Sequence, residues 1–263
     1  MVGEVKEILE ASDPRFMTSL ARGLDVLSAF EGQGALTVSQ AAKLCGLSRS
    51  ATARCLFTLE RLGYVDVRGT SYSLTPAVLP MARAFALGDR LMMAAQAVID
   101  TLRDRLGESS SLAMFDPRRA HTSVVYVYRA EAARIISVPL LMGSALPSYC
   151  TSNGRVLLAT LEPTALAAFL SQAPFPSRTN KTRISASSLA EEIDAIRTQG
   201  WAMTDGELEP GLRSIAVPVP GRRQPAALNL ATQSAHRGLD WLMNVALPEL
   251  QAAAAHLARV VTA

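Results

Sequence analysis

The sequence predicts an α+β fold in two parts, because two kinds of pattern follow each other along its 263 residues. Residues 16–75 show helical periodicity and then one strand–turn–strand pattern, whereas residues 110–263 alternate between strand and helix signals. Hydrophobic residues make up 49% of the chain, so each part can bury a core. In the second part we expect an α+β or α/β arrangement around a mixed sheet.

The first helix is expected within residues 16–30, after a lead-in at residues 1–15. Leu20, Leu24 and Leu27 recur there at the spacing of one helix face, which predicts an apolar stripe. The two glycines of EGQGA then end the helix.

Two further helices are expected on either side of a glycine. In TVSQAAKLC, Thr37 or Ser39 can cap the first turn of a short helix, and Gly46 ends it. Ser48 can cap a third helix, which runs to Leu62 and stops before another glycine. A short helix, a glycine turn and a second helix are the parts of a helix-turn-helix.

The two sides of the third helix predict different roles. At 100° per residue, four residues fall in one narrow sector and are expected to face the core: Ala51, Cys55, Leu59 and Leu62. The opposite side begins with basic, hydroxyl and small side chains, at Arg49, Ser50, Ala53 and Arg54. Arginine can bind guanine edges and a small residue permits close approach, so this side is expected to enter a DNA major groove. Phe57 also lies on the polar side, where it contacts DNA or a neighbour, unless a rotation of the helix packs it in the core.

A β-hairpin is expected in YVDVRGTSYSL, with Arg68 beside Gly69 at its tip as a basic wing. Residues 36–75 hold five Lys or Arg against two Asp or Glu, and Ser39 is the remaining predicted DNA contact. We therefore predict a winged helix-turn-helix in residues 16–75 that binds double-stranded DNA. A solvated arginine face, or a winged helix that binds protein, is the alternative.

Residues 76–90 predict a linker helix, because the helical pattern after the prolines is interrupted at Gly88. Residues 91–263 form the second part. Strands are expected in residues 110–115, 123–130, 134–140, 200–204, 213–219 and 226–232, and helices in residues 151–161, 163–172, 188–199 and 239–261.

Several classes of site lack a sequence signal. Three cysteines without a CxxC spacing and three scattered histidines predict neither a disulfide framework nor a metal site. We expect no cofactor and no catalytic residues, because the nucleophile elbow, the P-loop and the dinucleotide-binding motif are missing. An enzyme with an accessory winged helix is the alternative. Without a signal peptide or a long apolar run, the cytoplasm is expected.

The chain resembles the IclR family of bacterial transcription regulators in five segments that follow the family's order. They are SLARGLDVLSAF, LSRSATARCLFTLERLGYV, YSLTPAVL, LPSYCTSNGRVLLA and GWAMTDGELEPGLRSIAVPV. The sequences of these segments are most similar to those of the branch that governs breakdown of protocatechuate and 4-hydroxybenzoate. The resemblance implies a GAF-like α/β effector-binding domain after the linker helix. It also implies a homodimer, commonly a dimer of dimers, on a pseudo-palindromic operator.

The resemblance further implies an effector site for a small organic acid, here an aromatic acid such as a hydroxybenzoate or its derivative. Its predicted residues are Arg134, Ser152, Asn153, Thr204, Asp205, Ser214 and Asn229. Arg134 can pair with a carboxylate, although a surface arginine is the alternative. A thiol beside a helix start, as at Cys150, can have a lowered pKa, but we do not expect a redox or nucleophilic role for it. Glu207 either shapes its loop, binds a partner or stays solvated.

Overall fold

The structure, a computed structural model, describes residues 13–132, 140–220 and 224–262. The chain divides into two compact units between Gly88 and Asp89, inside the segment 76–90 that the sequence suggested as a linker. Each unit is described by itself. Arg134 and most of the strand expected at residues 134–140 lie outside the described residues.

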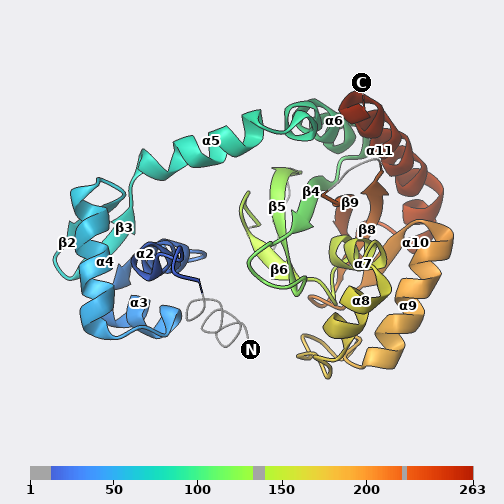
Figure 1. The fold of residues 1–263 in the computed structure, drawn as a ribbon. Helices are drawn as coiled ribbons and strands as arrows, with labels where there is room; N and C mark the ends of the chain where they lie inside the picture. Colours follow the sequence, from blue (N-terminus) through green and yellow to red (C-terminus); the bar gives the residue numbers. More distant parts are fainter. Residues whose placement is uncertain (1–12, 133–139, 221–223, 263) are drawn as a thin grey trace. The chain divides into compact units, whose positions relative to one another are not determined.

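In its described residues, the first unit has three helices followed by a hairpin and a further helix (Figure 1). Its elements are α2 (Thr18–Ser28), β1 (Leu36–Thr37), α3 (Val38–Cys45), α4 (Arg49–Arg61), β2 (Val65–Arg68), β3 (Ser71–Leu74), η1 (Pro76–Val78) and α5 (Leu79–Leu87). The three strands pair in the order β1-β3-β2, and both pairings are antiparallel. This is the winged helix-turn-helix that the sequence predicted.

Local signals place the ends of the helix-turn-helix. Thr37, rather than Ser39, caps α3 in a capping box with Gln40. The Ser48 hydroxyl accepts a hydrogen bond from the Ala51 amide at 3.2 Å and so caps α4. Gly46 follows α3 in the left-handed conformation, with φ of 67°, which a residue with a Cβ adopts at a cost. The predicted caps and the turn glycine are therefore confirmed.

The predicted core stripe of α4 is wrong by part of a turn. The fully buried positions are Thr52 and Leu56, with Leu59 beside them, whereas Leu62 is 64% exposed. Thr52 can face the core because its hydroxyl donates to the carbonyl of Ser48 at 3.0 Å. A polar side chain that hydrogen-bonds to the backbone of its own helix can be buried, but the hydrophobic periodicity of the sequence still assigns it to the surface.

The stripe predicted on α2 is also turned outward. Leu20 and Leu24 are each more than half exposed, and Val26 and Phe30 pack into the core instead. Those two side chains meet the α4 residues together with Leu36, Ala41 and Val65. Leu20 and Leu24 therefore belong to a surface, whereas the half-buried Leu27 packs against the core.

The second unit is a six-stranded sheet between helices. Its elements are α6 (Arg90–Leu106), β4 (Ser109–Phe115), β5 (Ser123–Ala130), β6 (Ala145–Pro147), α7 (Ser152–Ala159), α8 (Pro163–Leu170), α9 (Ala186–Gln199), β7 (Ala202–Asp205), β8 (Leu212–Val219), β9 (Ala226–Gln233), α10 (Leu239–Trp241), the π-helical η2 (Leu242–Ala246) and α11 (Leu247–Thr262). The strand order is β6-β5-β4-β9-β8-β7.

The sheet is antiparallel throughout its described pairings, so the expectation of a mixed sheet is wrong. Strands β4 and β5 follow one another directly, as do β7, β8 and β9, and a short connection that reverses the chain gives an antiparallel pair. The alternation of strand and helix signals did not reveal that β9 returns beside β4.

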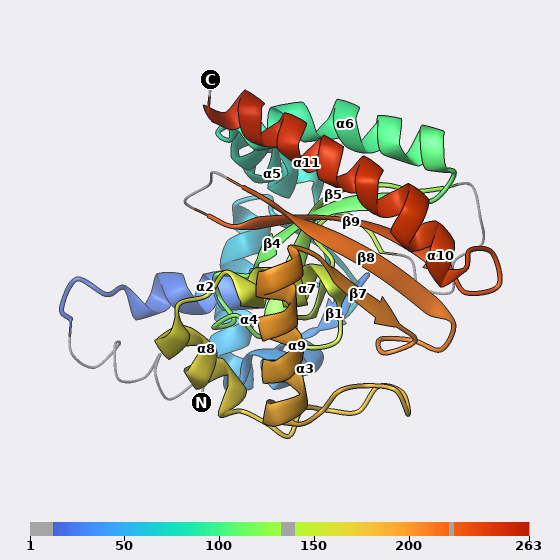
Figure 2. The same ribbon diagram turned by 90° about the vertical axis from the view of Figure 1, so that its right-hand side faces the viewer.

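Helices cover both faces of this sheet (Figure 2). Helices α6 and α11 pack side by side on one face, and α7 packs on the other, backed by α9. Residues from β4, β5 and α7, among them Ala113, Tyr126 and Leu157, are buried together on the α7 side. No helix in the described part of the chain is long and apolar enough to cross a membrane.

Candidate DNA-binding surface and effector cavity

The exposed face of α4 carries most of the predicted DNA contacts. Arg49, Ser50 and Arg54 are exposed, and Ala53 is half-buried among them. Phe57 stands on this face with 55% of its surface exposed, and the Arg61 guanidinium lies 5.2 Å from the centre of its ring. Packing of Phe57 in the core, the alternative offered by helix rotation, is therefore wrong.

Ser39 and Arg49 come together across the turn of the helix-turn-helix. Both line a shallow hollow between α3 and α4, to which Lys43 also contributes. Two cationic groups beside exposed hydroxyls form a surface that suits phosphate groups. Ser50 lies next to it, with its hydroxyl 3.1 Å from that of Ser48.

Arg68 stands at the tip of the hairpin, where Gly69 turns the chain with φ of 62°. Its side chain is 89% exposed and lies 3.4 Å from the Asp66 carboxylate. An ion pair this exposed holds the guanidinium only weakly, so Arg68 can turn to another anion.

An open apolar groove runs between α2 and α4. Leu20 and Leu24 line it from α2, Leu62 from directly after α4 and Met81 from α5, and each is more than half exposed. Arg54 lies at its edge. Apolar side chains gathered on one surface are typical of a protein–protein contact.

The second unit encloses a cavity of about 150 Å³ on the α7 side of the sheet. Its wall combines apolar and polar side chains: Ser109, Tyr126, Arg129, Leu140, Leu146, Cys150, Thr151, Arg178, Thr204, Leu208, Glu209, Ser214, Asn229, Ala231 and His236 are among them. Small side chains along β4 and β9, such as Ser109 and Ala231, leave the space above the sheet open. An enclosed site with a few polar groups on an apolar wall is typical of a small-molecule site.

A β-bulge turns Arg129 toward this cavity. Tyr126 pairs with Ala113 and Tyr128 with Leu112, so Val127 has no partner across the ladder. The extra residue puts Tyr126 and Arg129 on the cavity side, whereas the Tyr128 hydroxyl reaches Asp100 on α6. Strict alternation from Tyr126 would have sent Arg129 to the α6 side, which is why sequence reasoning missed it.

Arg129 is a buried cation with incomplete pairing. Its side chain is 5% exposed, Nη1 donates to the Ser111 hydroxyl at 3.2 Å, and the Glu131 carboxylate lies 3.9 Å from Nη2. Its Nε has no hydrogen-bond partner among the described residues. Burial lowers the pKa of Arg129, because the charged form loses hydration without a close carboxylate.

Three hydroxyl groups are linked at the β7–β8 end of the cavity. Ser214 lies 2.8 Å from the Ser152 hydroxyl and 3.0 Å from that of Thr204. Thr204 and Ser214 line the cavity, as does Asn229, which is 3% exposed. Within the described chain, the side-chain oxygen of Asn229 accepts no hydrogen bond.

Not all of the predicted effector residues lie on the cavity wall. Ser152 and Asn153 are buried in the first turn of α7, behind Cys150 and Thr151, which do line it. Asp205 faces away: its carboxylate pairs with Arg213 at 2.8 Å and with Lys181, and the Arg213 hydrogen bond lowers its pKa. The sequence put Asp205 and Thr204 in one segment, but neighbouring residues of a strand point to opposite faces.

Cys150 does not have the lowered pKa that its place beside a helix start suggested. Burial raises the pKa of this cavity-lining thiol to about 11, because the thiolate would lose its hydration. The neighbouring Arg178 opposes this effect but does not reverse it. A reactive thiolate is therefore disfavoured.

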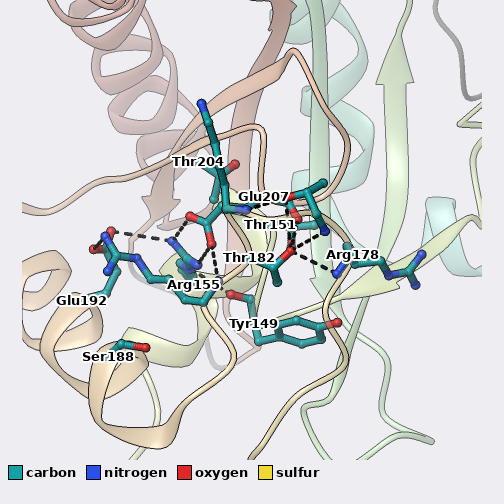
Figure 3. Close-up of polar contacts among 12 residues, drawn as sticks. Tyr149, Thr151, Arg155, Arg178, Thr182, Ser188, Glu192, Thr204 and Glu207 are labelled. Atoms are coloured by element: carbon teal, nitrogen blue, oxygen red, sulfur yellow. Dashed lines mark hydrogen bonds and ion pairs between the residues drawn. The ribbon is translucent and has the colours of Figure 1, made fainter.

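A buried ion pair holds the loops beside the cavity (Figure 3). Arg155 on α7 is fully buried, and its two terminal nitrogens donate to the two carboxylate oxygens of Glu207. The Arg155 Nε donates to the carbonyl of Tyr149 at 2.8 Å. Glu207 therefore shapes its loop, and its solvated alternative is wrong.

The loop that carries Thr179 and Thr182 is hydrogen-bonded to the loop that carries Gly206 and Glu207. Thr182 donates from its hydroxyl to the carbonyl of Glu207 at 2.7 Å (Figure 3). Thr179 donates to the carbonyl of Gly206 at 2.6 Å. Leu208 and Arg178, one from each loop, both line the cavity. The loops thus form one hydrogen-bonded wall.

Two family descriptions match the chain. "IclR helix-turn-helix domain" matches residues 19–69, and "Bacterial transcriptional regulator IclR C-terminal" matches residues 88–259. Among curated relatives, the Pca regulon regulatory protein of Pseudomonas putida is 41% identical over 249 residues, which are 93% of this chain and 84% of that protein. The p-hydroxybenzoate hydroxylase transcriptional activator of Acinetobacter baylyi is 29% identical, over 94% of this chain and 92% of that protein.

A solved structure adds a bound molecule. It is the inducer-binding domain of the PobR transcription factor from Acinetobacter, a double mutant in complex with 3-hydroxybenzoic acid. It is 26% identical to this chain, with a TM-score of 0.58, and covers 63% of this chain and 96% of that one. These relatives are regulatory proteins, which agrees with the absence of an enzyme motif.

Proposed function

Because the chain belongs to the IclR family of bacterial transcriptional regulators, we propose that an aromatic hydroxy acid in the cavity of the second unit controls its binding to operator DNA. The observation that carries this proposal is the cavity itself, whose wall joins apolar side chains to a buried, underpaired arginine. The similar PobR domain, which holds 3-hydroxybenzoic acid, supports the ligand class.

On the DNA side, we propose that α4 reads bases in the major groove and that the hairpin acts as a wing. Arg49, Ser50, Ala53 and Arg54 would be the contacts from α4, with Ser39 on α3 and Arg68 at the wing on the phosphates. Exposed cations on α4 and at the wing, with Lys43 beside Ser39 on α3, support this assignment.

We also propose a homodimer in which the groove between α2 and α4 is covered by a second copy, with dimers pairing into a tetramer. The exposed leucines of the groove would then lose their contact with water. The acid changes operator affinity only if it binds one arrangement of the copies better than another, and such coupling is typically about 1–3 kcal/mol.

The effector proposal is tested with the full chain by isothermal titration calorimetry against 4-hydroxybenzoate, 3-hydroxybenzoate and 3,4-dihydroxybenzoate. At least one acid is expected to bind, and to change the affinity of the chain for its own upstream DNA in a gel shift. The proposal is contradicted if the protein binds none of these acids and if none of them changes its affinity for DNA.

A further inference from the structure

We infer that Arg129 binds the effector carboxylate and that Asn229 accepts a hydrogen bond from the ligand's hydroxyl group, so that the acid lies across β5, β4 and β9. This inference rests on the proposed aromatic acid effector. It adds the direction in which the ligand lies and the two side chains that select its polar ends.

The cationic end of the site follows from the burial of Arg129. A buried guanidinium is normally held by a carboxylate, because removing the charge from water is costly. Here the carboxylate of Glu131 is 3.9 Å away and about half exposed, and Nε is left without a partner in the described chain. Residues 133–139 and 221–223 contain no Asp or Glu, so those segments cannot supply one.

A ligand carboxylate completes this arrangement. The guanidinium presents several N–H groups in one plane, and a carboxylate can accept two of them at once. Nη1 already donates to the Ser111 hydroxyl, which fixes the plane of the group. The unpartnered Nε and the weakly paired Nη2 remain for the ligand.

The opposite end follows from the register of the sheet. Ser111 pairs with Arg129 on one side and with Asn229 on the other, so the three residues form one row across β5, β4 and β9. Neighbouring strands are about 4.8 Å apart, which separates the Cα atoms of Arg129 and Asn229 by roughly 10 Å. The Arg129 guanidinium reaches over the small Ser111, and both Arg129 and Asn229 line the cavity, so the ligand's ring lies in the cavity between the guanidinium and Asn229.

Asn229 needs a donor at this place. Its side-chain oxygen is buried and accepts no hydrogen bond within the described chain. An unsatisfied buried acceptor destabilises the folded protein until a donor binds to it. The nearby hydroxyls of Ser214, Ser152 and Thr204 already bond to one another. A phenolic hydroxyl on the ligand supplies the missing donor.

The carboxylate end is tested by calorimetry with the full-length wild type, Arg129→Met and, as a matched control outside the cavity, Arg105→Met. Arg105 is 60% exposed and pairs with Glu249 across α6 and α11. For the acid that binds the wild type, we expect Arg129→Met to weaken affinity by roughly 10- to 100-fold, the loss typical of a charged hydrogen bond. The Arg105→Met variant keeps the wild-type affinity.

The outcomes separate this inference from the function it rests on. Wild-type affinity in Arg129→Met, with circular dichroism showing a folded protein, overturns the role of Arg129 while the effector proposal stands. A greater loss in Arg178→Met, the exposed cation on the same wall, also overturns it. If the wild type binds none of the acids, the effector proposal itself fails.

The hydroxyl end is tested with Asn229→Ala and a pair of ligands, 4-hydroxybenzoate and benzoate. If 3-hydroxybenzoate is the tighter wild-type ligand, it replaces 4-hydroxybenzoate in this pair. We expect the wild type to prefer the hydroxylated acid, and Asn229→Ala to reduce that preference to about equal affinities while still binding benzoate. A preference that stays at the wild-type ratio contradicts the assignment of Asn229.

Discussion

Cys150 shows how burial controls the chemistry of a single side chain. The folded protein raises the pKa of the thiol from an ordinary 9.0 to about 11, so it holds the thiol proton more tightly than the unfolded chain does. The resulting stability is fully present below pH 9 and is lost as the pH rises toward 11. The group lies inside the effector cavity, where a neutral thiol adds apolar wall.

We therefore expect the free energy of unfolding to decrease between pH 9 and 11, and to decrease less in Cys150→Ala. The difference between the two proteins is about 2 kcal/mol over this range, because most of the free energy of a shift of two pKa units is lost between these two pH values. Urea unfolding at pH 8, 9, 10 and 11 measures it. Parallel curves for the two proteins would show that the thiol does not titrate in this way.

The two arginines considered for the carboxylate illustrate what sequence can and cannot show about one residue. Arg134 was predicted because it opens an apolar run, and it lies outside the described residues. Arg129 lies within the strand predicted for residues 123–130, and no sequence signal gave it a role. Only the unpaired Val127 in the ladder puts it in the cavity, and a bulge has no reliable signal in a single sequence.

Helix α7 owes its position to the small size of one of its residues. A Cβ on Gly154 would lie 2.2 Å from the carbonyl oxygen of Ser148 and 2.3 Å from its Cα, which is closer than atoms can approach. The backbone before the helix therefore packs directly against its first turn. This contact places Thr151 and Cys150 on the wall of the cavity.

Gly154→Ala is expected to destabilise the second unit by about 1–3 kcal/mol or more, because backbone atoms must move to relieve the overlap. Gly238→Ala is the matched control, since nothing lies within 4 Å of a Cβ at Gly238 and its φ of −74° suits any residue. Thermal unfolding followed by circular dichroism measures both. Equal melting temperatures for the two variants would contradict the close approach.

The elements were predictable where their signals are local. The capping box at Thr37, the left-handed Gly46 and the hairpin tip at Gly69 all depend on neighbours within a few residues. The antiparallel pairing of β9 with β4 was not predictable, because the two strands are more than a hundred residues apart. The inward face of α4 also depends on distant partners, so periodicity alone placed its core stripe wrong by part of a turn.

Considered as a whole, the chain presents two surfaces that the folded monomer leaves incomplete. One is the apolar groove of the first unit, and the other is the polar interior of the second unit's cavity. Exposed leucines are costly in water, and unpartnered buried groups are costly inside a protein. The proposed partners, a second copy for the groove and an acid for the cavity, would remove these costs.

Leu62→Glu is expected to prevent dimer formation while leaving the fold intact, because Leu62 is 64% exposed in the single chain but lies in the groove. Size-exclusion chromatography with light scattering would show a monomer, with weakened operator binding. Leu44→Glu is the control, since Leu44 is 57% exposed and lies outside the groove. A Leu62→Glu protein with the mass of the wild-type assembly would show that the copies meet elsewhere.

Because Val127 has no partner in the ladder, the number of residues in β5 affects which ligands the cavity can select. One additional amino acid in β5 exchanges which of two adjacent side chains, the phenol of Tyr128 or the guanidinium of Arg129, faces the cavity. Insertions and deletions, as well as substitutions, can therefore change the charge that a regulator of this architecture recognises. Proteins with similar residues around this strand can therefore differ in the molecules they bind if their strand pairing is shifted by one residue.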